Sequence, residues 1–175
     1  MGPAAVILGL SLGHRTVREA EHWLGGHVAP LGLPDLVACT HLVASPYPHV
    51  ALSVAVPAAT DRLAGLPATP PQLRAAAERA AGEHAARSSG RAVRYPGSDR
   101  MVGTLTVAEL LAGSAVERVV VLGGPPAGPE TPLHTRDFVR PRWQAGELVL
   151  VVTPHRSGGV APFEVPDPTP CCADH

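Results

Sequence analysis

Short apolar runs, rich in β-branched residues and bounded by glycine, proline or polar residues, recur along the chain. Runs of this kind are typical of β-strands. Six of them are predicted as strands, over residues 4–10, 35–44, 49–56, 91–95, 117–124 and 147–154. Two runs, AVILGL and RVVVLG, are almost continuously apolar rather than alternating, which predicts strands covered on both faces and therefore a sheet with helices packed on it.

Three other segments have apolar positions at helical spacing and begin with a capping box, in which a Thr side chain and a Glu or Gln three residues later bind each other's backbone N–H groups. The boxes pair Thr16 with Glu19, Thr69 with Gln72, and Thr106 with Glu109. The first helix is predicted to end at Gly25–Gly26 and the third at Gly113, while the second, from Pro70 to Arg87, is the longest.

This order of elements predicts an α/β fold: a single domain with a mixed, mostly parallel sheet and about three packed helices. A chain of 175 residues fits one hydrophobic core. Residues 124–134 and 154–170 are rich in proline and glycine and are predicted as loops or an irregular C-terminal segment. The domain is expected over residues 1–165, followed by a tail over residues 166–175.

The net charge of the chain does not indicate a macromolecular partner. The formal net charge is −1 and the pI is about 6.7, which argues against nucleic acid and anionic membranes as partners. The first apolar run has no basic residue ahead of it and is too short to cross a bilayer, so a cytoplasmic location is expected. A small anionic molecule, held by a local cluster of arginines, is the expected partner, and a homo-oligomer is left open.

The C-terminal sequence CCADH contains the first candidate site. Cys171, Cys172 and His175 are three soft ligands within five residues, as zinc prefers, and His155 is the favoured fourth ligand, with His134, Asp174 or water as alternatives. Adjacent cysteines in an extended chain point in opposite directions, so a passive tail or a redox thiol are competing interpretations. Zinc is the only cofactor expected, because no Walker loop or dinucleotide fingerprint is present.

A second candidate lies where a predicted buried strand passes through His14 and Arg15 into the first helix. Ligands collect at the carboxyl ends of strands in open α/β sheets, and a helix N-terminus offers N–H groups to an anion. Arg15 is the predicted substrate-binding residue here, and His14 a predicted catalytic general base. The competing interpretation is an ordinary connecting loop at the surface.

The third candidate is the stretch LHTRDFVRPRW. If residues 134–140 are extended, the period of two places His134, Arg136, Phe138 and Arg140 on one face, with Arg142 and Trp143 directly after. Arginines beside aromatic rings can grip carboxylate or phosphate and stack on a planar group. Arg136, Arg140 and Arg142 are therefore predicted to bind substrate, and His134 to act in catalysis. The alternative is a solvated edge strand protected by charge.

Two functions follow from these candidates. The first is a small metal-assisted enzyme of hydrolase or lyase type, acting on a small anionic substrate at the C-terminal Cys/His cluster. The second is a non-catalytic ligand-binding or assembly module whose tail and arginine-rich strand contact a partner. His84, on the apolar stripe of the long helix, is expected to be a hydrogen-bonded core residue in either case.

Overall fold

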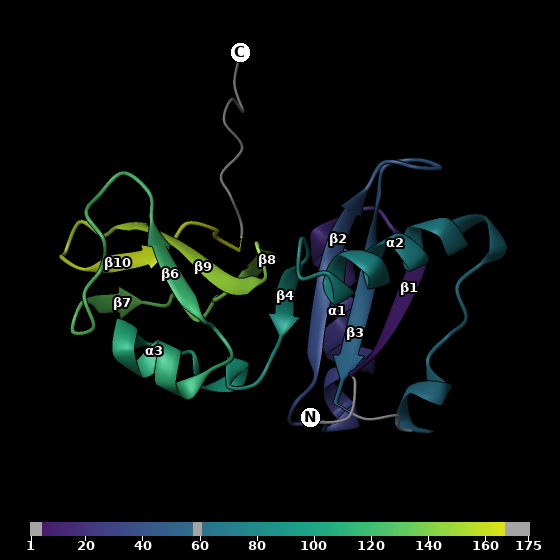
Figure 1. The fold of residues 1–175 in the computed structure, drawn as a ribbon, viewed down its shortest axis with the longest axis horizontal. Helices are drawn as coiled ribbons and strands as arrows, with labels where there is room; N and C mark the ends of the chain where they lie inside the picture. The colour runs from purple at the N-terminus through teal and green to yellow at the C-terminus, as the bar shows by residue number, and fades with distance from the viewer. Residues whose placement is uncertain (1–4, 58–60, 167–175) are drawn as a thin grey trace, which may run out of the picture.

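The computed structural model describes residues 5–57 and 61–166. In this part of the chain, three α-helices accompany a ten-stranded sheet (Figure 1). The helices are α1 (Val17–His27), α2 (Arg74–Ala85) and α3 (Val107–Gly113). The strands are β1 (Val6–His14), β2 (Val37–Val43), β3 (His49–Val56), β4 (Arg91–Arg94), β5 (Thr104–Thr106), β6 (Arg118–Val121), β7 (Pro132–His134), β8 (Arg142–Gln144), β9 (Glu147–Pro154) and β10 (Val160–Pro162).

The sheet is mostly antiparallel, so the prediction of a mostly parallel sheet is wrong. Its strand order is β1-β3-β2-β4-β8-β9-β10-β7-β5, with β6 paired to β9. Of the pairs formed by described residues, only β6–β9 and β7–β10 are parallel. One reason is the short connection over residues 44–48, since a link of this length joins β2 to β3 only as an antiparallel hairpin.

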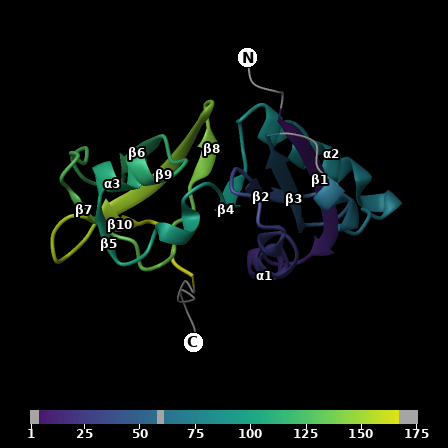
Figure 2. The same cartoon turned by 90° about the horizontal axis from the view of Figure 1, so that it is seen from below.

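The strands β1, β3, β2 and β4 form an N-terminal half in which α1 and α2 cover opposite faces (Figures 1 and 2). On one face Leu10 and Leu52 pack against Ala20 and Leu24 of α1. On the other, α2 passes so close to β1 that a Cβ atom on Gly9 would lie 1.9 Å from the Ala77 carbonyl oxygen. Coverage on both faces explains why these strands have the continuous apolar sequence that is also typical of parallel sheets.

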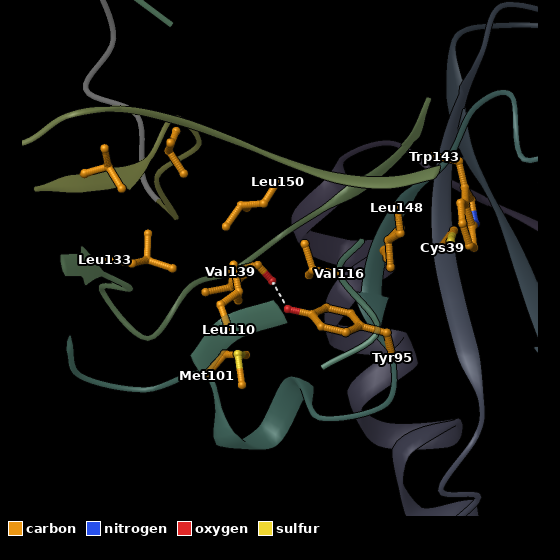
Figure 3. Packing of buried hydrophobic residues seen from close by; sticks show 13 residues of the cluster. Cys39, Tyr95, Met101, Leu110, Val116, Leu133, Val139, Trp143, Leu148 and Leu150 are labelled. Carbon is orange, nitrogen blue, oxygen red and sulfur yellow. Dashed lines mark hydrogen bonds between the residues drawn. The ribbon is translucent and has the colours of Figure 1, made fainter. Parts of the chain in front are cut away.

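The remaining strands and α3 form the C-terminal half around the largest buried cluster (Figure 3). Met101, Leu110, Leu133 and Leu150 meet there, and the Tyr95 hydroxyl donates a hydrogen bond to the Val139 carbonyl oxygen at 3.0 Å. Cys39 of β2 and Ala92 of β4 belong to the same cluster. The apolar core therefore continues from one half into the other.

The two halves join through a narrow part of the sheet, where β4 meets β8. Arg91 and Arg142 are the registered pair between these strands. Beside it, two backbone hydrogen bonds link the halves. The backbone N–H of Trp143 donates to the Gly90 carbonyl at 2.9 Å, and the backbone N–H of Ala92 donates to the Pro141 carbonyl at 2.7 Å. Few backbone bonds thus span the junction, and side chains must help to set how the halves face each other.

The helix starts agree in part with the predicted capping boxes. The Thr106–Glu109 box at α3 is complete. At α1 the Thr16 hydroxyl accepts from the Glu19 N–H, but the Glu19 carboxylate binds the Arg15 N–H. The Thr69–Gln72 box is wrong: the Thr69 hydroxyl accepts from the Ser11 N–H of β1, and α2 follows a 3₁₀ turn over Pro71–Leu73 without a side-chain cap.

Residues 135–138 turn instead of continuing β7, so the extended conformation expected over residues 134–140 is wrong. Arg136 and Asp137 have positive φ angles of 54° and 52°. The Thr135 hydroxyl accepts from the Asp137 N–H and donates to the Gly103 carbonyl, while the Asp137 carboxylate accepts from the Gly103 N–H. These local hydrogen bonds stabilise the turn. The side chains of residues 134–140 therefore do not alternate between two faces as predicted.

No helix in the described residues has the length and apolar character needed to cross a membrane.

Candidate functional site

A cleft of about 910 Å³ lies at the junction of the two halves. Thr40, Arg91 and Arg142 line it from β2, β4 and β8, and their register places them in one row on the sheet face that α1 covers. The opposite wall comes from α1 and from the segment that follows β10. The full lining is Val17, Arg18, Glu21, Thr40, His41, Leu42, Ser89, Gly90, Arg91, Phe138, Arg142, Trp143, Phe163, Glu164, Val165 and Pro166.

Five charged side chains form an alternating chain across this cleft. The Arg140 guanidinium binds the Glu21 carboxylate through Nε at 3.2 Å and Nη2 at 2.8 Å. Arg91 binds Glu21 on one side and Glu164 on the other, and Arg142 also binds Glu164. The chain connects α1 with the segment after β10, so it ties one half of the molecule to the other.

The charge balance in this chain favours anions. Three arginines face two glutamates, which leaves one positive charge in excess. Burial alone would raise the pKa of the Glu21 carboxyl, but hydrogen bonds from Arg140 and Arg91, together with their charges, outweigh burial and lower that pKa. Glu21 therefore remains ionised, and the arginines are held in a fixed arrangement.

Aromatic and aliphatic side chains complete the walls. Two guanidinium groups lie over the Phe138 ring. That of Arg140 is 4.3 Å and that of Arg91 is 5.5 Å from the ring centroid. Phe163 is 58% exposed and Leu42 is 76% exposed, although both are large and apolar. Such a surface suits a ligand that has a planar or apolar part beside its charge.

A separate polar network lies beneath α2, on the other face of the sheet. The His41 Nδ1 donates to the Glu83 carboxylate at 2.9 Å, because a carboxylate can only accept, and this leaves the His41 Nε2 to accept from the Ser53 hydroxyl at 2.8 Å. The Ser53 oxygen then accepts from the His84 Nδ1 at 2.7 Å. This path assigns one tautomer to each imidazole.

Both histidines of this network are neutral near pH 7. Burial lowers the pKa of His41 more strongly than Glu83 raises it. Burial lowers the pKa of His84 to about 4, and the positive charges of Arg87 and of His41, when His41 is protonated, act in the same direction. The expectation that His84 is a hydrogen-bonded core residue is confirmed.

The order carboxylate, imidazole and hydroxyl in this network is also that of a serine-hydrolase triad. Ser53 is fully buried, however, and its hydroxyl already forms hydrogen bonds with the imidazoles of His41 and His84. His41 borders the cleft, but its side chain is also fully buried. The network is thus placed to anchor α2 on the sheet and not to meet a molecule in the cleft.

The predicted substrate-binding arginines are divided between two places. Arg142 lines the cleft, and Arg140 binds Glu21 at its edge. Arg136 lies at the far end of the C-terminal half, where its charge acts on His155. The turn at residues 135–138 separates Arg136 from Arg140, which the predicted extended strand would have placed on one face.

His134 and His155 do lie together, with ring centroids 4.3 Å apart. The His134 Nε2 donates to the Gly158 carbonyl at 3.0 Å, and its Nδ1 is 3.3 Å from the Thr104 hydroxyl. The His155 Nδ1 lies 2.7 Å from the Ser157 hydroxyl. These two imidazoles lie apart from the cleft, since neither lines it.

His14 and Arg15 precede α1 and are not among the residues that line the cleft. The His14 ring lies 6.0 Å from the Trp23 ring, and within the described chain its Nδ1 is buried without a hydrogen-bond partner. Burial lowers the pKa of His14, and the Glu19 charge opposes this effect. The structure therefore does not bring the His14, His134 and arginine candidates into a single site.

The predicted zinc ligands Cys171, Cys172 and His175 lie outside the described residues, as does almost all of the tail over residues 166–175. Across residues 5–57 and 61–166, no group of three or more His, Cys, Asp or Glu side chains is placed to hold a metal ion. The metal site with His155 as fourth ligand stays a prediction.

Several important side chains were not identified in the sequence. Glu21, Arg91 and Glu164 come from three distant segments, and nothing in their local sequence indicates that they meet. Ser53 and His41 gave a better signal, because each is a polar residue inside an otherwise apolar strand. A buried polar residue of this kind requires a hydrogen-bond partner.

Comparisons of this chain with models of protein families, with curated proteins and with solved structures find no match.

Proposed function

We propose that this protein binds a small anionic molecule in the cleft between its two halves. The observation that carries the proposal is the convergence of Arg91 and Arg142, from neighbouring strands, on the single carboxylate of Glu164. Guanidinium groups in this arrangement match the geometry of carboxylate and phosphate. The cleft thus contains a position suited to an anionic group, which we call the anion position.

The surroundings of the anion position favour a ligand that also has a planar ring. Phe138 lies under the Arg91 and Arg140 guanidinium groups, and Phe163 offers a further exposed ring. A volume of about 910 Å³ lies within the range of roughly 300–1,000 Å³ found for small-molecule sites. An aromatic carboxylate is the simplest molecule that uses both features.

Benzoate provides a direct test, with benzyl alcohol as a neutral molecule of similar shape. The indole N–H signal of Trp143, which borders the cleft, can be followed by NMR during titration. The chain has two tryptophans, so a Trp23→Phe variant assigns that signal. Saturable binding of benzoate but not of benzyl alcohol is expected.

Arg142→Gln should weaken benzoate binding by about twofold or more, because it removes a charge-assisted hydrogen bond to the ligand. The matched control is Arg118→Gln, since Arg118 also pairs with a glutamate, Glu147, but lies outside the cleft. Failure of both benzoate and inorganic phosphate to bind the unmodified protein would overturn the proposal.

The metal-assisted enzyme remains a second candidate, supported by the closeness of His134 and His155 at a ring distance of 4.3 Å. His155 is one of the ligands predicted to join Cys171, Cys172 and His175 around zinc. Metal analysis of untagged protein should find one bound ion, which a Cys171→Ala, Cys172→Ala variant loses. Metal-free protein with an unchanged fold would exclude this candidate.

A further inference from the structure

Glu164 occupies the anion position of the cleft with both of its carboxylate oxygens. Its Oε2 accepts from the Arg91 Nε, and its Oε1 accepts from the Arg142 Nη2. A ligand carboxylate or phosphate that used the same two arginines would require the same place. Binding of such a ligand and the present position of Glu164 therefore exclude each other.

Few hydrogen bonds hold the segment that carries Glu164 to the other described residues. β10 ends at Pro162, and the Phe163 N–H donates to the Val151 carbonyl at 3.0 Å. Among described residues, no backbone hydrogen bond is formed by residues 164–166. Phe163 and Val165 are both exposed. Within the described part of the chain, the ion pairs of Glu164 are thus the main polar contacts of this segment.

Two cavities border the segment over residues 163–166. The cleft and a second cavity of about 260 Å³ are both lined by Arg142, Phe163 and Glu164. The rest of the second cavity is lined by Val120, Leu122, Arg140, Gln144, Leu150, Val151 and Pro162. Because Phe163 and Glu164 border both cavities, movement of these two residues changes the walls of both.

We infer that Glu164 is an internal competitor for the anion position and that a ligand binds by displacing it together with residues 163–166. The inference rests on the proposed function. Displacement leaves no arginine unpaired, because the incoming anion takes over both N–H donors while the Glu164 carboxylate passes into water. Ion pairs between partly exposed groups are weak enough to be exchanged in this way. Glu164 thus lowers, by one common factor, the apparent affinity of every ligand that requires both arginines.

The competition predicts that removing the charge of Glu164 strengthens binding. In the NMR titration with benzoate, Glu164→Gln should lower the Kd about tenfold, as expected if the anion position is free in only about a tenth of the unmodified molecules. Glu147→Gln is the matched control, because Glu147 pairs with Arg118 outside the cleft, and it should leave the Kd unchanged. Equal affinity of Glu164→Gln and the unmodified protein would overturn the inference while leaving the proposed function intact.

Hydrogen exchange on the unmodified protein gives a second measurement that does not depend on a variant. Saturating benzoate should speed exchange in a peptide covering residues 160–166, whereas benzyl alcohol should not. Slower or unchanged exchange in that peptide with benzoate bound would contradict displacement. If neither benzoate nor phosphate binds the unmodified protein, the proposed function and this inference fall together.

Discussion

The buried histidines beneath α2 predict that the protein loses stability between pH 7.5 and pH 5. His84 is 4% exposed, and its pKa is lowered to about 4 from the usual 6.5. Unfolded His84 takes up a proton as the pH falls below 6.5, whereas folded His84 remains neutral until about pH 4. Because the unfolded state binds more protons across this window, the free energy of unfolding decreases as the pH falls.

The size of the effect follows from the shift in pKa. Lowering the pKa of His84 from 6.5 to about 4 corresponds to a loss of about 3 kcal/mol when complete, and of about 2 kcal/mol at pH 5. The pKa of His41 is also lowered, so it adds a loss of the same sign. The carboxyls of Glu21 and Glu83 have pKa values lowered from 4.5, so their contribution is lost only at more acidic pH.

Urea unfolding followed by circular dichroism at pH 7.5, 6.5, 5.5 and 5.0 measures this loss. His84→Asn removes the titrating group but keeps an amide N–H donor near the position of Nδ1, where it can reach the Ser53 hydroxyl. This variant should lose markedly less stability on acidification than the unmodified protein. His22→Asn is the control, because His22 is exposed on α1. An unchanged pH dependence in His84→Asn would refute the reasoning.

Three further predictions concern single residues. Gly90→Ala should destabilise the protein by about 2 kcal/mol or more, because the added Cβ would lie 2.7 Å from the His41 Cε1 at a φ of +121°; an unchanged urea midpoint would contradict this. Thr106→Ala should cost about 1 kcal/mol through loss of the α3 cap, and a variant as stable as the parent would show that the cap contributes nothing. Burial raises the pKa of the Cys39 thiol to about 12, so iodoacetamide at pH 8 should leave Cys39 unlabelled in native protein and label it in urea, as read by peptide mass spectrometry. Labelling at equal rates would contradict its burial.

The sequence predicted strands best where the apolar runs are long. The bounds of β3 and β9 agree with the predicted residues 49–56 and 147–154. By contrast, β5, β7, β8 and β10 have three residues each, too few to produce a recognisable alternation. Such short strands form because tertiary pairing holds them. A continuous apolar run reflects coverage on both faces of a strand and not the direction of the neighbouring strand, so it does not predict whether a pair is parallel.

Part of the candidate site could also be predicted from the sequence. Arg140 and Arg142 were predicted to bind an anion, and they do lie at the cleft, where carboxylates of the protein hold them. The partners Glu21 and Glu164 are 119 and 22 residues away from these arginines. Pairing across such separations depends on the topology of the sheet, which local sequence patterns do not encode. Arg136 does not share a face with Arg140 as predicted, because local hydrogen bonds of Thr135 and Asp137 form a turn between them.

The narrow junction between β4 and β8 has a consequence for synthesis on the ribosome. All four strands of the N-terminal half and both helices that cover it come from residues 6–94, so this half emerges first. β8 begins 48 residues after β4 ends, and at about 5–20 residues per second that interval lasts a few seconds. During it, β4 presents an unpaired edge, a place where nascent chains can pair with each other. Arg91 and Arg94, at the two ends of β4, are charges that protect this edge until β8 arrives.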